Sequence, residues 1–447
     1  MLAGLAPDGG LYVPETWPPL DAAALEALQG CDYAEVALAV MRGFVGGEIP
    51  DRELAAMIDD AYAGFGHRAV APLRQLDGRR WLLELFHGPT LAFKDVALQL
   101  LGRLMDRELV RRGERATVIG ATSGDTGSAA IAAFSGCKAA DIHILHPHGR
   151  VSEVQRRQMT TVIAPNVHNI AVEGTFDDCQ KLVKALFADE RLNEGSRVAG
   201  VNSINWARIM AQIVYYVAAA VALGSPARRV SFAVPTGNFG DIYAGYVASR
   251  MGLPVGRLIV ATNVNDILVR ALQDGSYRVG EVRATMSPSM DIQVSSNFER
   301  VLFDASGRDG ATVAAMMKDL ASDGGFTIGA EALRRLREDF DAVRVDEETT
   351  ARCMERTLAE TGMLVDPHTA VGIAAADGAA TGPGEPLVVL ATAHPAKFPD
   401  AVEQATGMRP ELPPALAGLL DGPERYVVLP NDFRKVRDHI LATRVSA

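Results

Sequence analysis

The feature that most restricts the fold of this chain is a repeated alternation of strand and helix patterns, with glycine-rich turns between them. From Trp81 onward, short runs of β-branched and apolar residues are followed by longer amphipathic stretches. Such alternation predicts βαβ units, a largely parallel sheet and the α/β fold class. We expect strands at 80–86, 117–121, 142–145, 167–172, 230–234, 258–262 and 387–392. We expect helices at 94–111, 128–134, 177–187, 242–251, 331–343 and 347–361.

The part of the chain before this alternation has a different character. Residues 20–65 are rich in alanine and follow a helical spacing, and glycines and prolines interrupt the segment before them. A length of 447 residues exceeds what one hydrophobic core usually organises. We therefore expect an N-terminal helical subdomain over residues 1–76, an α/β domain over 77–215 and a larger α/β domain over 216–447.

The composition disfavours several classes of partner and location. The net charge is −11, from 55 acidic and 44 basic side chains, whereas nucleic acids and anionic membranes require a basic surface. The longest apolar run, 213–223, is shorter than the ~20 residues that span a bilayer. No signal peptide is expected, because the first residues carry no basic segment. Four cysteines without a Cys-x-x-Cys pair predict reduced thiols and a cytoplasmic protein: Cys31, Cys137, Cys179 and Cys353.

Three segments carry residues that are suited to chemistry. Lys94 ends the apolar loop 86–93, and a lysine among apolar residues is a candidate for a lowered pKa and a Schiff base. Its place at the start of an expected helix also disfavours its positive charge. The turns 122–127 and 236–241 are rich in glycine, and each opens an expected helix, where backbone N–H groups bind anions. One amine and two anion sites are what pyridoxal phosphate and an anionic amino acid require.

Each of these segments also has an ordinary interpretation. A lysine at the start of a helix is usually a surface residue, and a glycine turn is often only a tight connection between a strand and a helix. The turn 236–241 lacks the Gly-x-Gly-x-x-Gly pattern, so a dinucleotide cofactor is disfavoured.

The chain resembles threonine synthases of the longer, bacterial and fungal type. The resemblance rests on several long motifs in one order that together span nearly the whole chain: residues 4–14, 86–95, 122–127, 174–180, 202–208, 236–241 and 391–398. It implies a fold type II pyridoxal phosphate enzyme with two α/β domains around a cofactor cleft, as a monomer or homodimer. The implied reaction, the last step of threonine biosynthesis, converts O-phospho-L-homoserine and water into L-threonine and phosphate.

The resemblance also implies which residues hold the cofactor. Lys94 would bind it through a Schiff base and later move protons at the Cα and Cβ atoms of the substrate. Thr392 would place a neutral hydroxyl at the pyridine nitrogen. Asp241 is expected to point away from the phosphate and to cap a helix that begins at residue 242, because two anions repel each other. The turn implied to bind the cofactor phosphate consists of Gly237, Asn238, Phe239, Gly240 and Asp241.

Two further groups are implied to bind the substrate. Its α-carboxylate is expected at Thr122, Ser123, Asp125 and Thr126, although related pyridoxal enzymes have Asn where this chain has Asp125. Its phosphate is expected at Asn202, Ser203 and Arg208, because arginine offers phosphate a charged, forked donor.

Two alternatives stay open, and the histidines need a separate interpretation. Another fold type II lyase or β-replacement enzyme, such as one like threonine dehydratase, would have no use for a substrate-phosphate group. A catalytically idle homologue would be expected to lose the lysine or a glycine turn, and both are present. His143, His146 and His148 have no acidic or cysteine neighbour at ligand spacing, so no metal site is expected. His87 and His394 lie in matched motifs and are expected to line the pocket.

Overall fold

The structure is a computed structural model that describes residues 2, 4–194, 196–201 and 203–444. Its N-terminal part is helical, as expected, with α1 (Ala22–Ala27), α2 (Tyr33–Val45) and α3 (Asp51–Tyr62). A capping box begins α2, because the Asp32 carboxylate accepts from the Glu35 N–H group and the Glu35 side chain accepts from Asp32. The helix ends at Gly46, which has a left-handed φ of 57°.

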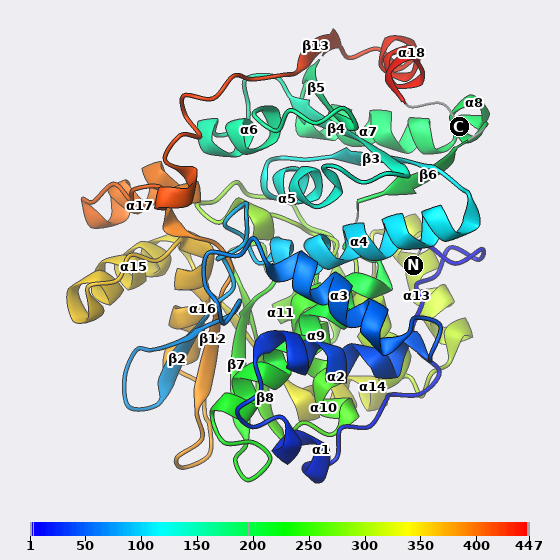
Figure 1. Ribbon diagram of the computed structural model, residues 1–447. Helices are drawn as coiled ribbons and strands as arrows, with labels where there is room; N and C mark the ends of the chain where they lie inside the picture. The colour runs from blue at the N-terminus through cyan, green and yellow to red at the C-terminus, as the bar shows by residue number, and fades with distance from the viewer. Residues whose placement is uncertain (1, 3, 195, 202, 445–447) are drawn as a thin grey trace.

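A six-stranded sheet forms the larger of two α/β units (Figure 1). All of its strand pairs are parallel except the pairing of the edge strand β1 with β2. The two central strands, β12 and β7, are buried along their whole length, which explains their continuously apolar sequences. In spatial order the strands are β1 (Leu73–Gln75), β2 (Arg80–Glu84), β12 (Leu387–Ala391), β7 (Val230–Pro235), β8 (Val255–Thr262) and β11 (Phe340–Arg344).

A five-stranded, wholly parallel sheet forms the second unit. Its spatial order is β13 (Val427–Pro430), β5 (Val167–Glu173), β4 (Ala140–Pro147), β3 (Ala116–Ala121) and β6 (Arg197–Gly200). A separate antiparallel pair joins β9 (Ser276–Arg278) to β10 (Gly325–Thr327). The two larger sheets lie in the upper and lower parts of Figure 1, with the long helix α4 (Lys94–Arg112) between them.

Helices surround both sheets. Two of them, α4 and α9, are mostly buried and belong to the main hydrophobic core together with strands of both sheets. Helix α9 spans Trp206–Ala222. The remaining helices are α5 (Asp125–Phe134), α6 (Glu153–Thr160), α7 (Phe176–Phe187), α8 (Glu190–Asn193), α10 (Gly240–Met251), α11 (Ile267–Asp274), α12 (Phe298–Ala305), α13 (Gly310–Asp323), α14 (Ala330–Asp339), α15 (Glu347–Thr361), α16 (Pro367–Asp377), α17 (Pro399–Thr406) and α18 (Phe433–Thr443). Short 3-10 helices lie at η1 (Pro288–Met290), η2 (Pro395–Lys397) and η3 (Pro414–Leu416).

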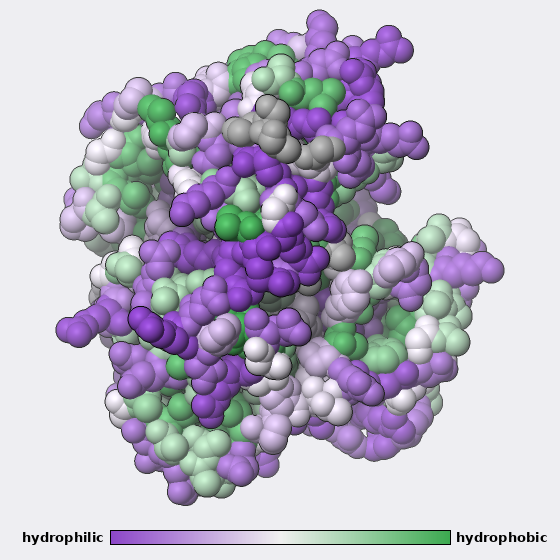
Figure 2. Space-filling view, turned by 45° about the vertical axis from the view of Figure 1, so that its right-hand side comes forward, coloured by the Kyte–Doolittle hydropathy of each residue, from purple (hydrophilic) through white to green (hydrophobic). Residues whose placement is uncertain are grey.

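The surface is mixed in character. On the face drawn in Figure 2, hydrophobic side chains form separate patches among hydrophilic ones. Among the described residues, no helix combines the length and the apolar character that crossing a membrane requires.

The sheets do not follow the domain boundaries expected from the sequence. Strand β2 lies within the expected 77–215 domain but pairs with β12 in the six-stranded sheet. Strand β13 lies within the expected 216–447 domain but pairs with β5 in the five-stranded sheet. The single helix α9 runs across the expected boundary at residue 215. Each unit therefore takes strands from distant parts of the chain.

One expected helix is also shorter than predicted. The helix expected over 331–343 ends at Asp339, and the following residues form β11. Phe340 is buried and its ring lies 5.7 Å from the ring of Tyr246, and its backbone is extended to pair with β8. Pairing at the edge of the sheet therefore overrides the helical spacing at this point.

Candidate active site

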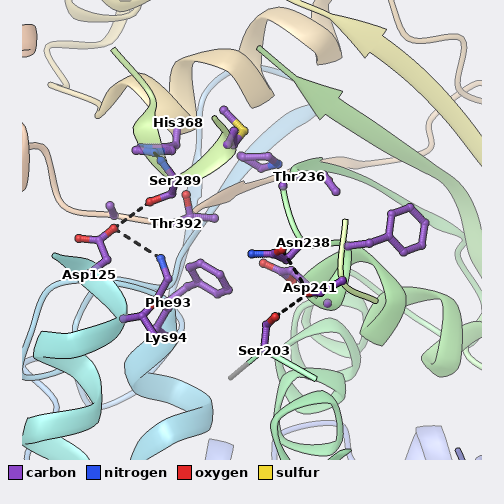
Figure 3. Close-up of a pocket in the computed structure, with 18 of the residues that line it drawn as sticks. Phe93, Lys94, Asp125, Ser203, Thr236, Asn238, Asp241, Ser289, His368 and Thr392 are labelled. Carbon is purple, nitrogen blue, oxygen red and sulfur yellow. Dashed lines mark hydrogen bonds and ion pairs between the residues drawn. The ribbon is translucent and has the colours of Figure 1, made fainter. Parts of the chain in front are cut away.

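A cavity of about 340 Å³ lies between the two sheets, where the N-termini of α4, α5 and α10 meet the segment that follows β12 (Figure 3). All the described residues predicted to bind the cofactor or the substrate line this cavity. Asn202, which was also predicted, lies outside the described residues. The lining residues that the sequence predicted are Lys94, Thr122, Ser123, Asp125, Thr126, Ser203, Arg208, Gly237, Asn238, Phe239, Gly240, Asp241 and Thr392.

The loop that carries Lys94 is bound to the segment that carries Thr392. The Phe93 N–H group donates to the Thr392 carbonyl over 2.8 Å, and the His394 N–H group donates to the Leu91 carbonyl over 3.0 Å. Leu91 has a φ of 60°, which is uncommon for a residue with a side chain. These two backbone bonds fix the start of α4 relative to the end of β12, and so fix Lys94 relative to Thr392.

A buried carboxylate closes the same loop from the other side. Asp95 accepts from the N–H group of Thr90 over 2.8 Å and from its hydroxyl over 2.7 Å. Gly88 leaves room for this carboxylate, because a Cβ atom there would lie 2.4 Å from the Asp95 Cβ atom.

Lys94 is the first residue of α4, as predicted. Its Nζ atom lies 3.4 Å from an oxygen of Asp125 and 4.9 Å from the centre of the Phe93 ring. Burial lowers the pKa of Lys94, Asp125 opposes that change, and the positive charges of Lys397 and Arg208 lower the pKa further. A larger fraction of this amine is therefore neutral and nucleophilic than for an exposed lysine.

Two turns present backbone N–H groups to the cavity. Among the described residues, none accepts a hydrogen bond from the N–H groups of residues 237–240 or of Ser123, Asp125 and Thr126. Gly237 is required by space, because a Cβ atom there would lie 2.9 Å from the Ser289 carbonyl oxygen. Both turns are therefore suited to bind anions.

The turn at 122–127 is shaped by its own side chain. The Thr122 hydroxyl accepts from the N–H groups of Gly124 and Gly127, each over 2.9 Å. This hydroxyl maintains the turn, which leaves Ser123 and Thr126 to offer theirs to a ligand.

Asp241 differs from the prediction. Helix α10 begins at Gly240, and no side chain caps it. The Asp241 carboxylate instead accepts from the hydroxyls of Tyr215 over 2.5 Å and Tyr216 over 3.0 Å, both on α9. Burial raises its pKa to about 6, although the two tyrosines partly oppose this change. The tyrosine pair draws the carboxylate to the cavity wall and away from the end of the helix.

Arg208 brings a positive charge to the cavity. The residue is 4% exposed, and its Nε atom has no hydrogen-bond partner. Within the described part of the chain, no carboxylate forms an ion pair with it, and burial lowers its pKa to about 10. Ser203 lines the same part of the cavity, with its hydroxyl 2.8 Å from that of Ser296. A buried guanidinium without a partner is suited to bind an anionic ligand.

The comparisons with known proteins agree with this geometry. Residues 67–332 match the family model described as pyridoxal-phosphate dependent enzyme. Residues 1–62 and 369–440 match those described as threonine synthase N terminus and threonine synthase, C-terminal. The chain is 54% identical to the threonine synthase of Pseudomonas aeruginosa over 438 residues, which cover 98% of this chain and 93% of that protein. The chain belongs to the threonine synthase family.

Solved structures of the threonine synthase family show the same fold. A pyridoxal-phosphate-bound threonine synthase from Brucella melitensis has a TM-score of 0.97 and 55% identity, over 99% of this chain and 95% of that one. The threonine synthase from yeast has a TM-score of 0.94 and 40% identity, over 99% of this chain and 94% of that one. This chain is therefore a fold type II, pyridoxal-phosphate-dependent lyase, and the predictions of family, fold class and cofactor are confirmed.

Several residues at the site of this threonine synthase family member were not predicted from the sequence. His368 lines the cavity, where its Nε2 atom accepts from the Ser289 N–H group over 3.1 Å and its Nδ1 atom lies 2.7 Å from Asp366. Lys397 lies behind the cavity, 3.0 Å from Asp125. Lys397 belongs to the matched motif 391–398, and this motif is the sequence feature from which its place near the site could have been predicted. Nothing in the local sequence marks His368 or Ser289.

The other histidines lie away from this cavity. His87 and His394 line a neighbouring cavity of about 740 Å³ instead, so the expectation that they line the first pocket is wrong. Within the described ranges, no group of three His, Cys, Asp or Glu residues could hold a metal ion. His143 stacks on His168 with ring centres 4.4 Å apart.

Proposed function

We propose that this member of the threonine synthase family converts O-phospho-L-homoserine and water into L-threonine and phosphate. The observation that supports it is the presence of three anion-binding positions around one amine. The cofactor needs one position for its phosphate. An amino acid with a phosphorylated side chain needs the other two, one for its carboxylate and one for its phosphate. A lyase that acts on an unphosphorylated amino acid would leave the position at Arg208 without a use.

The cofactor is assigned to the residues that fit its parts. We assign the cofactor phosphate to the free N–H groups of the turn 237–240 and the cofactor aldehyde to the Lys94 amine. Thr392 follows the buried strand β12 and would offer the ring nitrogen a neutral hydroxyl. When bound, pyridoxal phosphate supplies an electron sink for the negative charge that develops at Cα. Asp241 contributes through its two tyrosines rather than by touching the phosphate.

The substrate is assigned to the two remaining positions. Ser123 and Thr126 would bind the α-carboxylate through their N–H and hydroxyl groups, while Asp125 is held by lysines and does not touch it. Arg208 and Ser203 would bind the substrate phosphate, together with Asn202. Negative charge grows on this phosphate as its bond to carbon breaks, so a buried guanidinium at this position lowers the barrier to its departure.

Proton transfer is assigned to Lys94. It would take a proton from Cα and move protons at Cβ, both of which require a neutral amine at some stage. The low pKa that burial gives Lys94 supports this role. Lys94 is the only lysine among the described residues that line the cavity. Water has to stay outside until the phosphate has left, since the proposed reaction adds it only afterwards.

The remaining parts of the proposal concern the class of substrate and the location of the protein. The substrate is a small molecule, and we propose a cytoplasmic protein, which the four free cysteines support.

The direct test is an assay of the purified protein with O-phospho-L-homoserine, in which released phosphate and threonine are quantified together. Equal amounts of both are expected. Borohydride reduction followed by peptide mapping should place the cofactor on Lys94. Lys94→Ala should abolish both results, and Lys318→Ala, on the exposed surface of α13, should change neither. Formation of a keto acid without threonine would favour another fold type II lyase. Absence of any trapped cofactor would favour a non-catalytic homologue.

A further inference from the structure

The carboxylate of Asp125 lies between two lysines that differ in how they are bound. Lys397 is fully buried, and its Nζ atom lies 3.0 Å from one Asp125 oxygen. The same Nζ atom donates to the Thr90 carbonyl over 2.7 Å and to the Gln158 side chain over 3.1 Å. Thr90 and Gln158 thus accept hydrogen bonds from two of the three N–H donors of this ammonium group, and the Asp125 carboxylate is its ion-pair partner. Lys397 does not line the cavity, so it has no access to a ligand there.

Lys94 forms a longer ion pair with the same carboxylate than Lys397 does. Its Nζ atom lies 3.4 Å from the other Asp125 oxygen, whereas bonds between an ammonium and a carboxylate are usually about 2.7–2.9 Å. Gln155 donates to the first Asp125 oxygen over 2.8 Å, and the Ser289 hydroxyl donates to the second over 3.2 Å. Figure 3 shows Asp125 with its contacts to Lys94 and Ser289. The carboxylate is therefore shared among four groups.

On the basis of the proposed role of Lys94, we propose that Lys397 is a positioning residue for its amine. Lys397 holds the Asp125 carboxylate and takes up most of its charge, which leaves the Lys94 amine free to act as a nucleophile and base. Without Lys397, the buried carboxylate would have Lys94 as its nearest cation. A closer ion pair would keep Lys94 protonated and bound.

Other charged groups also act on this pair, and all of them stay in place in the test below. Arg208 on α9 faces Lys94 and disfavours its ammonium form, and His368 on α16 acts on Asp125. Asp241 on α10 also acts on Lys94, but its carboxylate is bound by two tyrosines. Asp95 on α4 also acts on Lys397, and its carboxylate is bound to Thr90.

The test measures the reactivity of Lys94 directly. The full chain, freed of cofactor, is acetylated in competition with a free amine at a series of pH values, and the Lys94 peptide is quantified by mass spectrometry. Lys397→Met should raise the pH midpoint of Lys94 reactivity by about one unit, a tenfold loss of neutral amine below the midpoint. Asp125→Asn should lower the midpoint. Lys318→Met, on the exposed face of α13, is the control and should leave it unchanged.

The decisive comparison is Lys397→Met in the Asp125→Asn background, where no carboxylate is left to pair with Lys94. The midpoint there should rise by less than in the single variant, because only the direct repulsion between the two ammonium groups is lost. An unchanged midpoint in the single variant, or equal shifts in both backgrounds, would overturn the proposal. If Lys397→Met does not fold, Lys397→Gln keeps a donor toward Thr90 and should show the same shift. Because labelling uses neither substrate nor cofactor, a failure to make threonine would not alter its outcome.

Discussion

Replacing Arg208 with methionine should make the ligand-free protein more stable and the enzyme much less active. Arg208 is 4% exposed, and no carboxylate among the described residues forms an ion pair with it. Methionine has a similar length, fills the same space and carries no charge to bury. A residue that costs stability when the cavity is empty and contributes binding when it is filled is typical of a ligand site.

The size of both effects follows from the burial of the charge. Burial lowers the pKa of Arg208 to about 10, against an ordinary value of roughly 12.5. The pKa of Arg208 in the folded state lies below its value in the unfolded state, so at neutral pH the buried charge destabilises the folded state to its full extent. This destabilisation decreases only as the pH rises above about 10. At about 1.4 kcal/mol per pKa unit, the cost is roughly 3 kcal/mol. Loss of two charged hydrogen bonds to a phosphate should cost about 3–5 kcal/mol of transition-state binding, or roughly 10²- to 10⁴-fold in kcat/KM.

The two effects are measured separately. Urea unfolding of the cofactor-free protein at pH 7.5 should show a gain in unfolding free energy of about 1–3 kcal/mol for Arg208→Met. Steady-state kinetics with O-phospho-L-homoserine should show the loss in kcat/KM. Arg150→Met, at an exposed position, should change neither quantity and serves as the control. A variant that is both less stable and less active would show that Arg208 has a structural role, and would refute the reasoning.

Two more predictions concern the turn that is proposed to hold the cofactor phosphate. Gly237→Ala would place a Cβ atom 2.9 Å from the Ser289 carbonyl oxygen, so the turn has to shift. The affinity for pyridoxal phosphate should then fall at least tenfold in equilibrium dialysis. An unchanged affinity would mean that this turn does not bind the cofactor. Asp241→Asn should stabilise the cofactor-free protein at pH 8 by roughly 1–3 kcal/mol. Burial raises the pKa of this carboxylate to about 6, so above that pH its negative charge destabilises the folded protein. The gain should shrink as the pH falls through 6 toward 4, which thermal melts at several pH values would show; a gain independent of pH would contradict the assignment.

The sequence predicts, in order, the strands β2, β3, β4, β5, β7, β8 and β12, because buried parallel strands are continuously apolar and stand out from the helices around them. Strand β11 was missed for a physical reason. Phe340 lies four residues after Leu336 and so continues the helical spacing of buried positions, while its pairing with β8 depends on a partner about 80 residues earlier in the chain. The sheet partners of β2 and β13 were missed for the same reason, since their pairing leaves no trace in the neighbouring sequence.

The candidate site shows the same limit. Lys94 and both glycine turns are recognisable because each is a short, continuous segment whose residues suit the chemistry. Asp241 was misplaced because the hydroxyls that hold it come from another helix, α9. Lys397 could be quoted as part of a motif, but only the folded chain shows that its ammonium faces Asp125.

The two backbone bonds that join the Lys94 loop to the segment after β12 have a consequence for biosynthesis of the protein itself. Phe93 emerges from the ribosome long before its acceptor, the carbonyl of Thr392, has been translated. The reactive amine therefore reaches its working position only when nearly the whole polypeptide exists. A chain truncated by premature termination ahead of β12 would retain Lys94 and both glycine turns but lack the backbone partners that fix the loop carrying this amine.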